Sequence, residues 1–599
     1  MSPASEVVSA LSSELGVSRL LATVLANRLA SRGIETPAPA LAEAEAFLHR
    51  RPAGSTDPFL LDGMDRAVTR VLEAIESRQR IVVFGDYDAD GLTATAVLLT
   101  ALRERGATAS AYIPARATEG YGLNPGAIRQ IHDEGADLVI TVDCGVTALP
   151  EAALARSLGL DLVITDHHEP GTELPQAVAV VNPRRPGSEY PFSELAGVGV
   201  AYKLVQAIEQ VEGLRRGPLF AAAAGASSER LLDLVALGTV CDVVPLVGEN
   251  RQFVSRGLRL FNPPGRTGLA ALARVARLEG KALTAYHLAF QFGPRLNAAG
   301  RLGDAEASLR LLLTAEAGEA EAIAAALDQG NRERQVLEGR IFEEAAERVT
   351  AGDLDAERAI VLAGEGWHEG VIGIVASRLV ERFARPALLV AVGGGSGRGS
   401  GRSIGCFDLV GALDECSRWL DRHGGHRMAA GFEIREEAIE AFSRDFLELA
   451  RRRLAREDLV HELRIDACVE PAELLGEDGR GNGPGLLDEL GRLEPYGTGN
   501  PEPVFALSRV AFASARTVGE GGRHLKATLR AGGRTMDAIG FGMGGLAGQL
   551  AAGSGTGAAD AGLYDIAFRP EMNEWQGLRR MELKLVDVRA AGLEPVFAK

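Results

Sequence analysis

The chain has 599 residues, of which 46% are hydrophobic and 24% charged, and its formal net charge at pH 7 is −17. This length exceeds what one hydrophobic core serves, so three or four domains are expected. The negative charge argues against bulk affinity for nucleic acid, although it permits a local basic channel. No apolar run reaches the ~18 residues of a membrane span, and the first residues lack a secretory-signal pattern. The five cysteines form no C-x-x-C pair, so reduced thiols and a cytoplasmic location are expected.

The first half of the chain predicts an α/β domain. An Ala- and Leu-rich segment over residues 1–45 has helical spacing and predicts a helical lead-in. Strands and helices then alternate, an order that predicts a parallel sheet covered by helices. The expected strands are 81–84, 107–114, 136–145 and 160–168, and the expected helices are 92–106, 126–135 and 149–159.

Acidic side chains follow three of these strands. Because the carboxyl ends of parallel strands meet at one edge of a sheet, we expect these groups to converge. They are Asp86, Asp88 and Asp90 after the first strand, Asp143 at the end of the third, and Asp166, His167 and His168 at the end of the fourth. Capping of the following helix explains one of these acids but not the rest. Asp242, in the apolar stretch 231–246, is either one more member or an acid satisfied by backbone donors at a turn.

Crowded carboxylates indicate a bound cation, because a cation neutralises their mutual repulsion. Oxygen ligands with one or two imidazoles suit Mg²⁺ or Mn²⁺. A set this large predicts two ions about 3.5–4 Å apart, the arrangement that serves phosphoryl transfer.

The second half of the chain predicts further domains. Residues 305–350 predict helices, the last one long, that link two lobes, and residues 356–455 predict a second α/β unit. Within it, the glycine-rich segment 393–405 is either a flexible loop or a phosphate site built from amides, a hydroxyl and a guanidinium. From residue 460 short strands predict a small β-barrel such as an OB-fold. Phe505, Phe512 and Lys526 are candidate contacts that stack on DNA or neutralise its charge, although most aromatic residues of this region are expected to lie in the core.

Ordered motifs identify a family. FGDYDADG, VDCG, TDHHEP and LGTVCDVVPL, in this order, resemble the DHH phosphoesterase superfamily. GPRLNAAGRLGDA, GWHEGVIGIVASRL, GSGRSIGCFDL, GGHRMAAGF and LEPYGTGNPEPVF narrow the resemblance to its RecJ family, from about residue 45 to the end. The resemblance implies an α/β fold with two lobes built on parallel sheets, joined by a long helix and followed by an OB-fold-like barrel. The expected boundaries are a lead-in over 1–45, a DHH domain over 46–310, a connecting helix over 311–355, a DHHA1 domain over 356–455 and the barrel over 456–599.

The resemblance also implies site residues. The implied metal ligands are Asp86, Asp88, Asp90, Asp143, His167 and Asp242, with His168 as a second catalytic imidazole. A pocket for a 5′-end phosphate is implied at Ser400 and Arg402, with Arg116 as a helper. Arg295, Asn297 and Arg301 either clamp backbone phosphates or pin the catalytic domain to the connecting helix. His426 either contacts the scissile phosphate or is satisfied inside a helix start.

The implied activity is hydrolysis of single-stranded DNA from the 5′ end to 5′-mononucleotides, with two Mn²⁺ or Mg²⁺ ions. The implied setting is repair and recombination beside a single-strand-binding protein and a helicase, as a monomer without membrane attachment. Two alternatives stay open. A DHH phosphodiesterase of short oligonucleotides or cyclic dinucleotides would usually lack residues 460–599, and a non-catalytic DNA-binding relative would have an incomplete carboxylate set.

Overall fold

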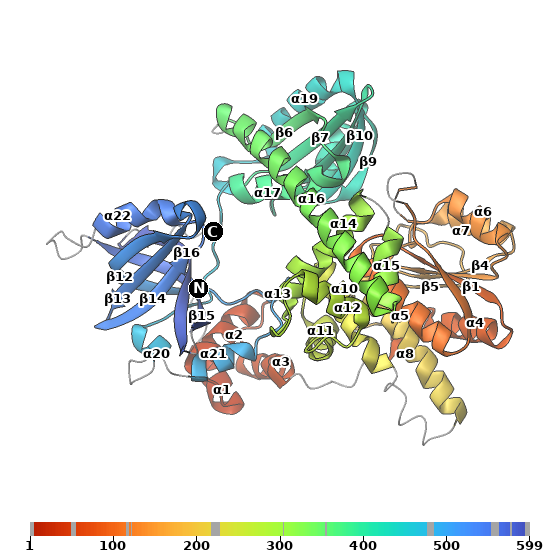
Figure 1. The fold of residues 1–599 in the computed structure, drawn as a ribbon, viewed down its shortest axis with the longest axis horizontal. Coiled ribbons are helices and arrows are strands. Elements are labelled where there is room, and N and C mark those ends of the chain that lie inside the picture. Colours follow the sequence, from red (N-terminus) through yellow and green to blue (C-terminus); the bar gives the residue numbers. More distant parts are fainter. Residues whose placement is uncertain are drawn as a thin grey trace. The chain divides into compact units, whose positions relative to one another are not determined.

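The computed structural model describes two compact units of this chain. The described residues are 5–49, 56–115, 119–120, 122–216, 228–302, 305–353, 356–475, 484–552, 562–575 and 578–592. The first unit comprises Met1–Asp57, Val243–Ser255 and Leu463–Lys599, and the second comprises Pro58–Asp242 and Arg256–Glu462. Figure 1 labels the elements of both units. No helix of the described residues is both long enough and apolar enough to cross a membrane.

The domain that carries the candidate metal ligands, in the second unit, is built on a parallel sheet, as predicted. The sheet has five strands. Its strand order is β2-β1-β3-β4-β5, and every neighbouring pair is parallel. The strands are β1 (Arg80–Gly85), β2 (Thr108–Tyr112), β3 (Leu138–Val142), β4 (Asp161–Thr165) and β5 (Ala179–Val181). The central strand β3 is buried along its whole length, which explains its continuous run of apolar residues. The short β5 was not expected from the sequence.

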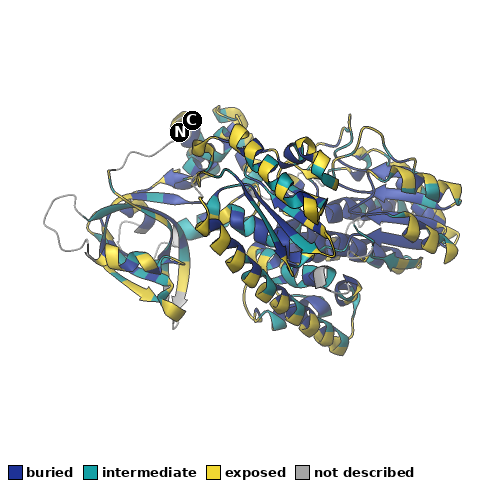
Figure 2. Ribbon diagram, turned by 90° about the horizontal axis from the view of Figure 1, so that it is seen from above, coloured by how far each residue is buried: buried dark blue, intermediate teal, exposed yellow. Residues whose placement is uncertain are grey.

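Helices cover this sheet, and Figure 2 shows the strands in dark blue beneath helices with exposed outer faces. The helices are α4 (Met64–Glu76), α5 (Ala89–Glu104), α6 (Pro125–Asp133), α7 (Leu149–Ser157), α8 (Gly197–Arg216) and α10 (Leu232–Cys241). Helix α5 begins three residues earlier than predicted because the side chain of Asp88 accepts from the N–H groups of Asp90 and Gly91 and caps it. The apolar stretch around 231–246 is the helix α10, and Asp242 is its C-cap.

Further helices lead to the second sheet. They are α11 (Gly248–Leu260), α12 (Thr267–Val275), α13 (Ala285–His287), the π-helical η3 (Leu288–Phe292), α14 (Gly293–Leu302), α15 (Ala305–Leu313) and the predicted long helix α16 (Ala317–Ala351). Arg295 of α14 forms an ion pair of 2.9 Å with the buried Asp328 of α16. Of the two roles open for Arg295, the structure therefore shows the one that pins α14 to the connecting helix.

The second sheet is mixed rather than parallel. Its order is β6-β7-β8-β10-β9, in which only β6 and β7 run parallel. The strands are β6 (Ile360–Glu365), β7 (Ala387–Gly393), β8 (Ser396–Arg402), β9 (Leu420–His426) and β10 (Ala429–Arg435), with helices α17 (Glu369–Phe383), α18 (Leu409–Glu415) and α19 (Ile439–Arg453). Gly394 and Gly395 have positive φ and turn the chain back between β7 and β8. The glycine-rich segment is therefore a hairpin and a strand, not a loop.

The first unit joins the N-terminal helices to a β-barrel. Strands β12 (Phe505–Val518), β13 (His524–Ala531), β14 (Arg534–Gly540), β16 (Leu578–Ala590) and β15 (Leu563–Trp575) pair in this order, and a β12–β15 pairing closes the barrel. The short β11 (Ala467–Cys468) pairs with β12. The helices are α1 (Ser5–Leu15), α2 (Arg19–Ala30), α3 (Pro37–His49), α20 (Pro471–Leu475), α21 (Pro484–Gly491) and α22 (Ala547–Ala552).

One continuous hydrophobic core unites α1–α3 with the barrel, a packing that the sequence alone did not reveal. Phe505 and Phe512 belong to this core and are buried, and Lys526 forms an ion pair with Glu582. The two phenylalanines are therefore core residues rather than exposed stacking partners for DNA, and a DNA contact of Lys526 stays a prediction. The five domain boundaries expected from the sequence stay a prediction.

Candidate metal centre

The segment after β1 supplies the first three acids of the site, Asp86 in the loop, Asp88 at the N-cap of α5 and Asp90 in its first turn. Asp86 and Asp90 are buried, whereas Asp88 is partly exposed. Both carboxylate oxygens of Asp90 accept backbone N–H groups at the start of α8, Oδ2 from Gly197 at 2.7 Å and Oδ1 from Val198 at 3.0 Å. The positive end of the α8 dipole therefore faces this carboxylate and holds it in place.

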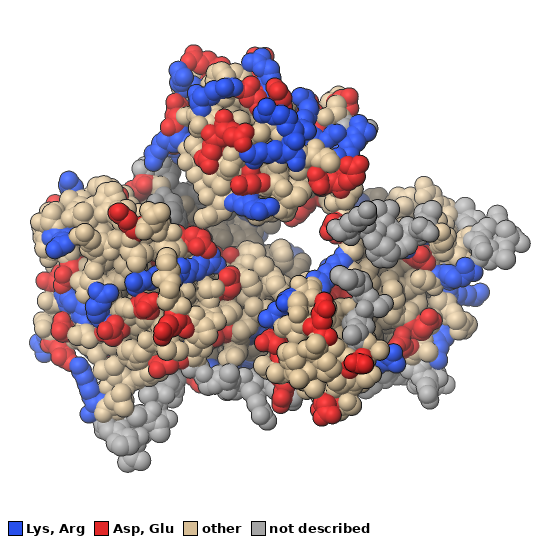
Figure 3. All heavy atoms as spheres, turned by 180° about the vertical axis from the view of Figure 1, so that it is seen from behind, with Lys and Arg blue, Asp and Glu red and all other residues tan. Residues whose placement is uncertain are grey.

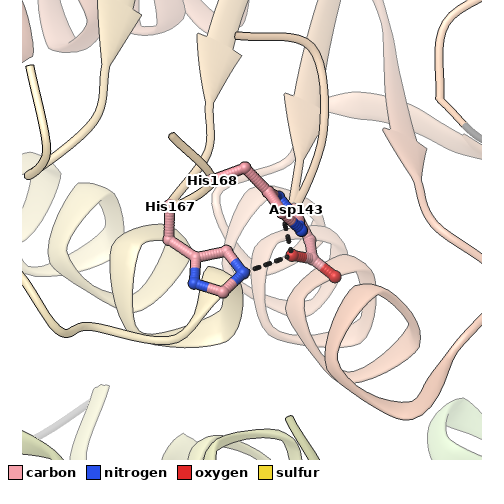
Figure 4. Close-up of side chains that lie close together, drawn as sticks. All are labelled: Asp143, His167 and His168. Atoms are coloured by element: carbon pink, nitrogen blue, oxygen red, sulfur yellow. Dashed lines mark ion pairs between the residues drawn. The ribbon is translucent and has the colours of Figure 1, made fainter. Parts of the chain in front are cut away.

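The other candidates come from three further chain segments. Asp143 follows β3 and adopts a left-handed backbone conformation with φ of 62°. Nε2 of His167 lies 3.1 Å from Asp143 Oδ1 and 3.7 Å from Asp242 Oδ2. Nδ1 of His168 lies 4.0 Å from the same oxygen of Asp143, so both imidazoles face this acid (Figure 4).

Three groups of ligand atoms emerge, each within 4.8 Å, and they share members. They are Asp143 with His167 and His168, Asp90 with His167 and Asp242, and Asp86 with Asp88 and Asp143. The structure thus brings together all the ligand candidates predicted from the sequence. The first group shares His167 with the second and Asp143 with the third. Together the three groups have the donors for two adjacent cations.

Three acids of this cluster, Asp90, Asp143 and Asp242, resist ionisation without a cation. Burial, followed by the charge of Asp88, raises the pKa of Asp90 to about 7. Burial and then the neighbouring acids raise the pKa values of Asp143 and Asp242 well above the ordinary range. Burial and then the charge of His168 lower the pKa of His167 to about 3, so its ring is neutral as a metal ligand requires.

Buried polar atoms that lack hydrogen-bond partners indicate whether a divalent cation fits this site. His167 Nε2 and Asp242 Oδ2 are buried and have no hydrogen-bond partner among the described residues. Buried polar atoms without partners are costly, and a divalent cation satisfies such atoms while neutralising the acids around them. Carboxylates with a neutral imidazole form the donor set that Mn²⁺ and Mg²⁺ accept. The residues present therefore fit these ions.

Comparisons with known proteins assign this chain to a family. It matches the DHH family, N-terminal domain, over residues 80–239, the DHHA1 domain over 356–452 and the RecJ OB domain over 481–587. It is 37% identical to the single-stranded-DNA-specific exonuclease RecJ of Bacillus subtilis over 587 residues, which is 98% of this chain and 70% of that protein. The corresponding protein of Escherichia coli is 37% identical over 87% of this chain and 89% of its own length. The chain belongs to the RecJ family.

Solved RecJ structures have the same fold and contain these ions. RecJ from Thermus thermophilus in complex with Mn²⁺ has a TM-score of 0.79 and 33% sequence identity, covering 98% of this chain and 78% of that one. Its complex with Mg²⁺ has a TM-score of 0.74 and 32% identity, covering 98% and 77%. Mn²⁺ and Mg²⁺ are the cofactors that the acid and imidazole set of this RecJ chain predicted.

Asp166 is a positioning residue of the RecJ centre. Its Oδ1 accepts the backbone N–H of His167 at 2.7 Å and lies 2.8 Å from Nδ1 of His168, while Oδ2 accepts the N–H of Val146 at 2.9 Å. Burial opposes its ionisation, but the hydrogen bond and charge of His168 outweigh burial and lower the pKa of Asp166. A charged Asp166 therefore holds the backbone of His167 and the ring of His168, and it belongs to none of the three ligand groups.

Sequence reasoning missed the small residues that let the RecJ elements meet. A Cβ on Gly197 would lie 2.5 Å from Asp143 Oδ1, and a Cβ on Gly238 would lie 2.8 Å from Asp90 Oδ1. Both glycines stand inside quoted or neighbouring motifs, but nothing in the local pattern shows what they face. Asn297 Oδ1 accepts the N–H of Ala89 at 2.7 Å, so this side chain braces the start of α5, and its phosphate contact stays a prediction.

The residues predicted to contact phosphate lie at different places in the second sheet. Ser400 and Arg402 lie together on β8, where Arg402 Nη1 donates to Ser400 Oγ at 3.3 Å. Both face α17, because a Cβ on its Gly373 would lie 2.8 Å from Ser400 Oγ and 3.1 Å from Arg402 Nη2. His426 ends β9 and is exposed beside a hairpin, so the alternative that places it inside a helix start is wrong, and its phosphate contact stays a prediction.

Two further arginines cannot be placed in this way. Arg116 lies outside the described residues, and Arg301 lies in α14 with its side chain outside the description.

On the face shown in Figure 3, blue and red side chains are interspersed over the part of the chain that carries α19. This face therefore presents no single-sign field, and phosphate recognition there would depend on individual arginines.

Proposed function

We propose that this RecJ-family chain is a 5′→3′ exonuclease that degrades single-stranded DNA to 5′-mononucleotides with two Mn²⁺ or Mg²⁺ ions. The observation that carries this proposal is the cluster of five carboxylates and two imidazoles, most of which are buried. The chain also matches, along most of its length, proteins named single-stranded-DNA-specific exonucleases, and this match supports single-stranded DNA as the substrate.

The three ligand groups suggest how the ions are divided. Asp86, Asp88 and Asp143 would hold one ion, and the group of Asp90, His167 and Asp242 would hold the other. Bound divalent ions lower the pKa of water and neutralise charge on phosphate oxygens. The helix dipole of α8 keeps Asp90 fixed while the substrate binds.

His168 is assigned a phosphate contact. Burial lowers the pKa of His168, but the hydrogen bond and charge of Asp166 outweigh it and raise the pKa above its ordinary value. Its side chain is 36% exposed and therefore accessible to substrate. With Nδ1 turned toward Asp166, Nε2 is the ring nitrogen that would donate to a phosphate oxygen.

The remaining assignments follow family membership. We infer that Ser400, Arg402, Arg116, Arg301 and His426 contact the DNA, with Ser400 and Arg402 at the 5′-end phosphate. We also infer a cytoplasmic monomer that works in repair and recombination beside a single-strand-binding protein and a helicase.

A gel assay tests polarity and activity together. The purified protein is incubated with Mn²⁺ and a single strand that carries a 5′-phosphate and a 3′ label. A labelled ladder that shortens from the 5′ end supports the proposal, and immediate release of a labelled mononucleotide would overturn its direction. An uncut strand beside a hydrolysed dinucleotide would favour the small-substrate phosphodiesterase, and binding without cleavage would favour the non-catalytic relative.

Replacing Arg402 by alanine is expected to remove the preference for a 5′-phosphate. Loss of a charge-assisted pair lowers kcat/KM on the 5′-phosphorylated strand about tenfold to a hundredfold, with little change on a 5′-hydroxyl strand. The measurement compares both strands in parallel. Arg398→Ala is the matched control, because Arg398 lies on the same strand but pairs with Glu369 at 3.0 Å. An unchanged preference in Arg402→Ala would remove this residue from the end pocket.

A further inference from the structure

Two exposed aromatic rings precede α14 and have no role in the chemistry assigned so far. Tyr286 of α13 is 61% exposed and Phe290 of η3 is 62% exposed. Their ring centroids lie 4.8 Å apart, with 36° between the ring planes. Among the described residues of the second unit, no other phenylalanine, tyrosine or tryptophan side chain is fully exposed. Single exposed apolar residues are ordinary, whereas apolar side chains that gather at one place indicate a binding surface.

The backbone that carries the two rings is fixed from its other face. Leu288 and Phe292 lie on that face and are fully buried. The ring of Phe292 packs edge to face against Phe261, with 5.6 Å between the centroids. The segment is also π-helical, a rare geometry that commonly occurs at functional sites. The two rings are therefore held outward by a packed segment of the second unit.

Contacts of η3 place the pair beside a metal-ligand candidate. The thiol of Cys241, which directly precedes Asp242, donates to the carbonyl of Leu288 at 3.7 Å. A Cβ on Gly293 would lie 2.5 Å from the same sulfur. Phe290 precedes Gly293 by less than one helical turn, which is under about 5.4 Å along the axis. The rings therefore lie close to the end of α10 that carries Asp242.

The following helix, α14, continues along the same metal centre. Its Asn297 accepts the N–H of Ala89 at 2.7 Å, and a Cβ on Gly300 would lie 2.9 Å from the carbonyl oxygen of Tyr87. Tyr87 and Ala89 alternate with the acids of the segment after β1. One helical stretch, labelled α13 and α14 in Figure 1, therefore borders the metal centre and continues past it to the two rings.

The surroundings of the pair suit a strand with bases and phosphates. His287 is fixed beside Tyr286, with 5.9 Å between the ring centroids, and its Nδ1 accepts the N–H of Thr284 at 3.1 Å. Burial and then the charge of the exposed Lys281 lower the pKa of His287, so this ring is neutral at pH 7. Aromatic rings beside a cation are the combination that holds single-stranded nucleic acid, since bases stack and phosphates are neutralised.

We propose that Tyr286 and Phe290 form a stacking platform for bases of the DNA strand on the 3′ side of the bond that is cut. The intact strand lies on that side when the 5′ end occupies the metal centre. Every base has a π-face, so the stacking platform holds the strand without reading its sequence. The two residues bind substrate and take no part in the chemical step. The inference rests on the proposed exonuclease function and names what holds the strand beyond its first nucleotide.

The first cleavage event tests the stacking platform, because it keeps every nucleotide in a known position. The probe is a single strand with a radioactive 5′-phosphate, and the release of labelled mononucleotide by the full-length protein with Mn²⁺ is measured. Phe290→Ala is expected to raise KM about tenfold to a hundredfold with little change in kcat, because a base loses its stacking partner. Phe290→Trp retains an aromatic face and should keep the unaltered KM.

Val336→Ala is the matched control. Val336 lies on α16 in the same unit and is 72% exposed, so this variant removes an equally exposed apolar side chain elsewhere. It should keep the unaltered KM. Circular dichroism checks that each variant folds, and Tyr286→Ala replaces Phe290→Ala if the latter does not.

Strands with one missing base connect the rings to particular nucleotides. The abasic position is moved along the strand from the second nucleotide, and KM for the first cleavage is measured for each strand. With the unaltered protein, KM should rise at one or two neighbouring positions. With Phe290→Ala, these positions should cost nothing further, because ring and base are the two sides of one contact. Losses that simply multiply in the variant would overturn the stacking platform.

The measurements separate failure of the stacking platform from failure of the proposed function. If the unaltered protein releases no labelled mononucleotide from the 5′ end, the proposed function is wrong. If it does so while Phe290→Ala and Tyr286→Ala keep the unaltered KM, the stacking platform alone is wrong. A variant that loses kcat at unchanged KM would give the rings a structural role and would also overturn the inference.

Discussion

Asp143→Asn is expected to lower the rate of single-strand hydrolysis by more than about a hundredfold, because even outer-shell supports of metal sites are worth 10–100-fold. Asp143 belongs to two of the three ligand groups, and Nε2 of His167 lies 3.1 Å from its Oδ1. An amide keeps the size of the side chain but removes the charge that attracts the cations. Initial rates on a 5′-phosphorylated single strand, at saturating Mn²⁺, provide the measurement.

The same variant should have the opposite effect on the metal-free protein. Burial and then the charges of Asp90, Asp88 and the other acids raise the pKa of Asp143, so its ionised form is unfavourable in the empty cluster. A neutral asparagine relieves this repulsion, and the unfolding temperature in chelator should rise while the stabilisation by Mn²⁺ shrinks.

Asp137→Asn is the control for both measurements of Asp143. Asp137 is exposed and lies at the opposite end of the same strand, where its carboxylate accepts the N–H of Arg80 at 2.8 Å. It should keep the unaltered rate and the unaltered response to Mn²⁺. Cleavage by Asp143→Asn at the unaltered rate would refute the assignment of this residue to the metal centre.

Removal of the cations is expected to destabilise the protein increasingly as the pH rises from about 4 to about 7. The folded metal-free protein retains the proton of Asp90 up to a pKa of about 7, whereas the unfolded chain loses it near the ordinary value of 3.8. Stability from this group is fully present below the unfolded pKa and is lost as the pH rises through the folded pKa. Each such group contributes up to about 1.4 kcal/mol per pH unit.

His167 works in the opposite direction. Its pKa is lowered to about 3, so its stability contribution is present above the ordinary 6.5 and is lost as the pH falls. The raised pKa values of Asp90, Asp143 and Asp242 outnumber this single imidazole, so the acids determine the net sign. Because bound cations displace the same protons, stabilisation by Mn²⁺ should grow with pH.

Thermal unfolding in Mn²⁺ and in chelator, across this range, measures the effect. The difference between the two unfolding temperatures should increase from acid to neutral pH. A difference that stays constant or shrinks would contradict the coupled protonation of the acids. Asp143→Asn should flatten the dependence, since it removes one of the three raised groups.

Local sequence pattern predicted four of the five strands of the catalytic sheet and missed the short β5. Parallel strands need apolar runs on both faces and crossover helices between them, and both signals are visible within about 30 residues. The order of strands and acids therefore predicted that Asp86, Asp143 and His167 meet at one edge, and the structure confirms it. The same reasoning predicted the long helix α16 and the strands of the barrel.

Local pattern failed where small residues carry the geometry. The glycine-rich segment before Arg402 resembles a loop, because glycine has low strand propensity. It is nevertheless the strand β8, whose neighbours β7 and β10 supply the pairing that its own residues do not encode. For the same reason, the direction of the strands in this sheet was not predictable.

By itself, the sequence determined the fold class, the family and the types of ligand, because apolar periodicity and ordered motifs are local properties. Only the tertiary structure decided what holds the ligands. Asp90 is fixed by an amide of α8 that lies 107 residues further along the chain, and Asp166 holds the backbone of His167 and the ring of His168. The N-terminal helices share the core of the barrel, far away in sequence. Contacts of this kind depend on how distant segments pack against each other, and no periodicity in either segment records its partner.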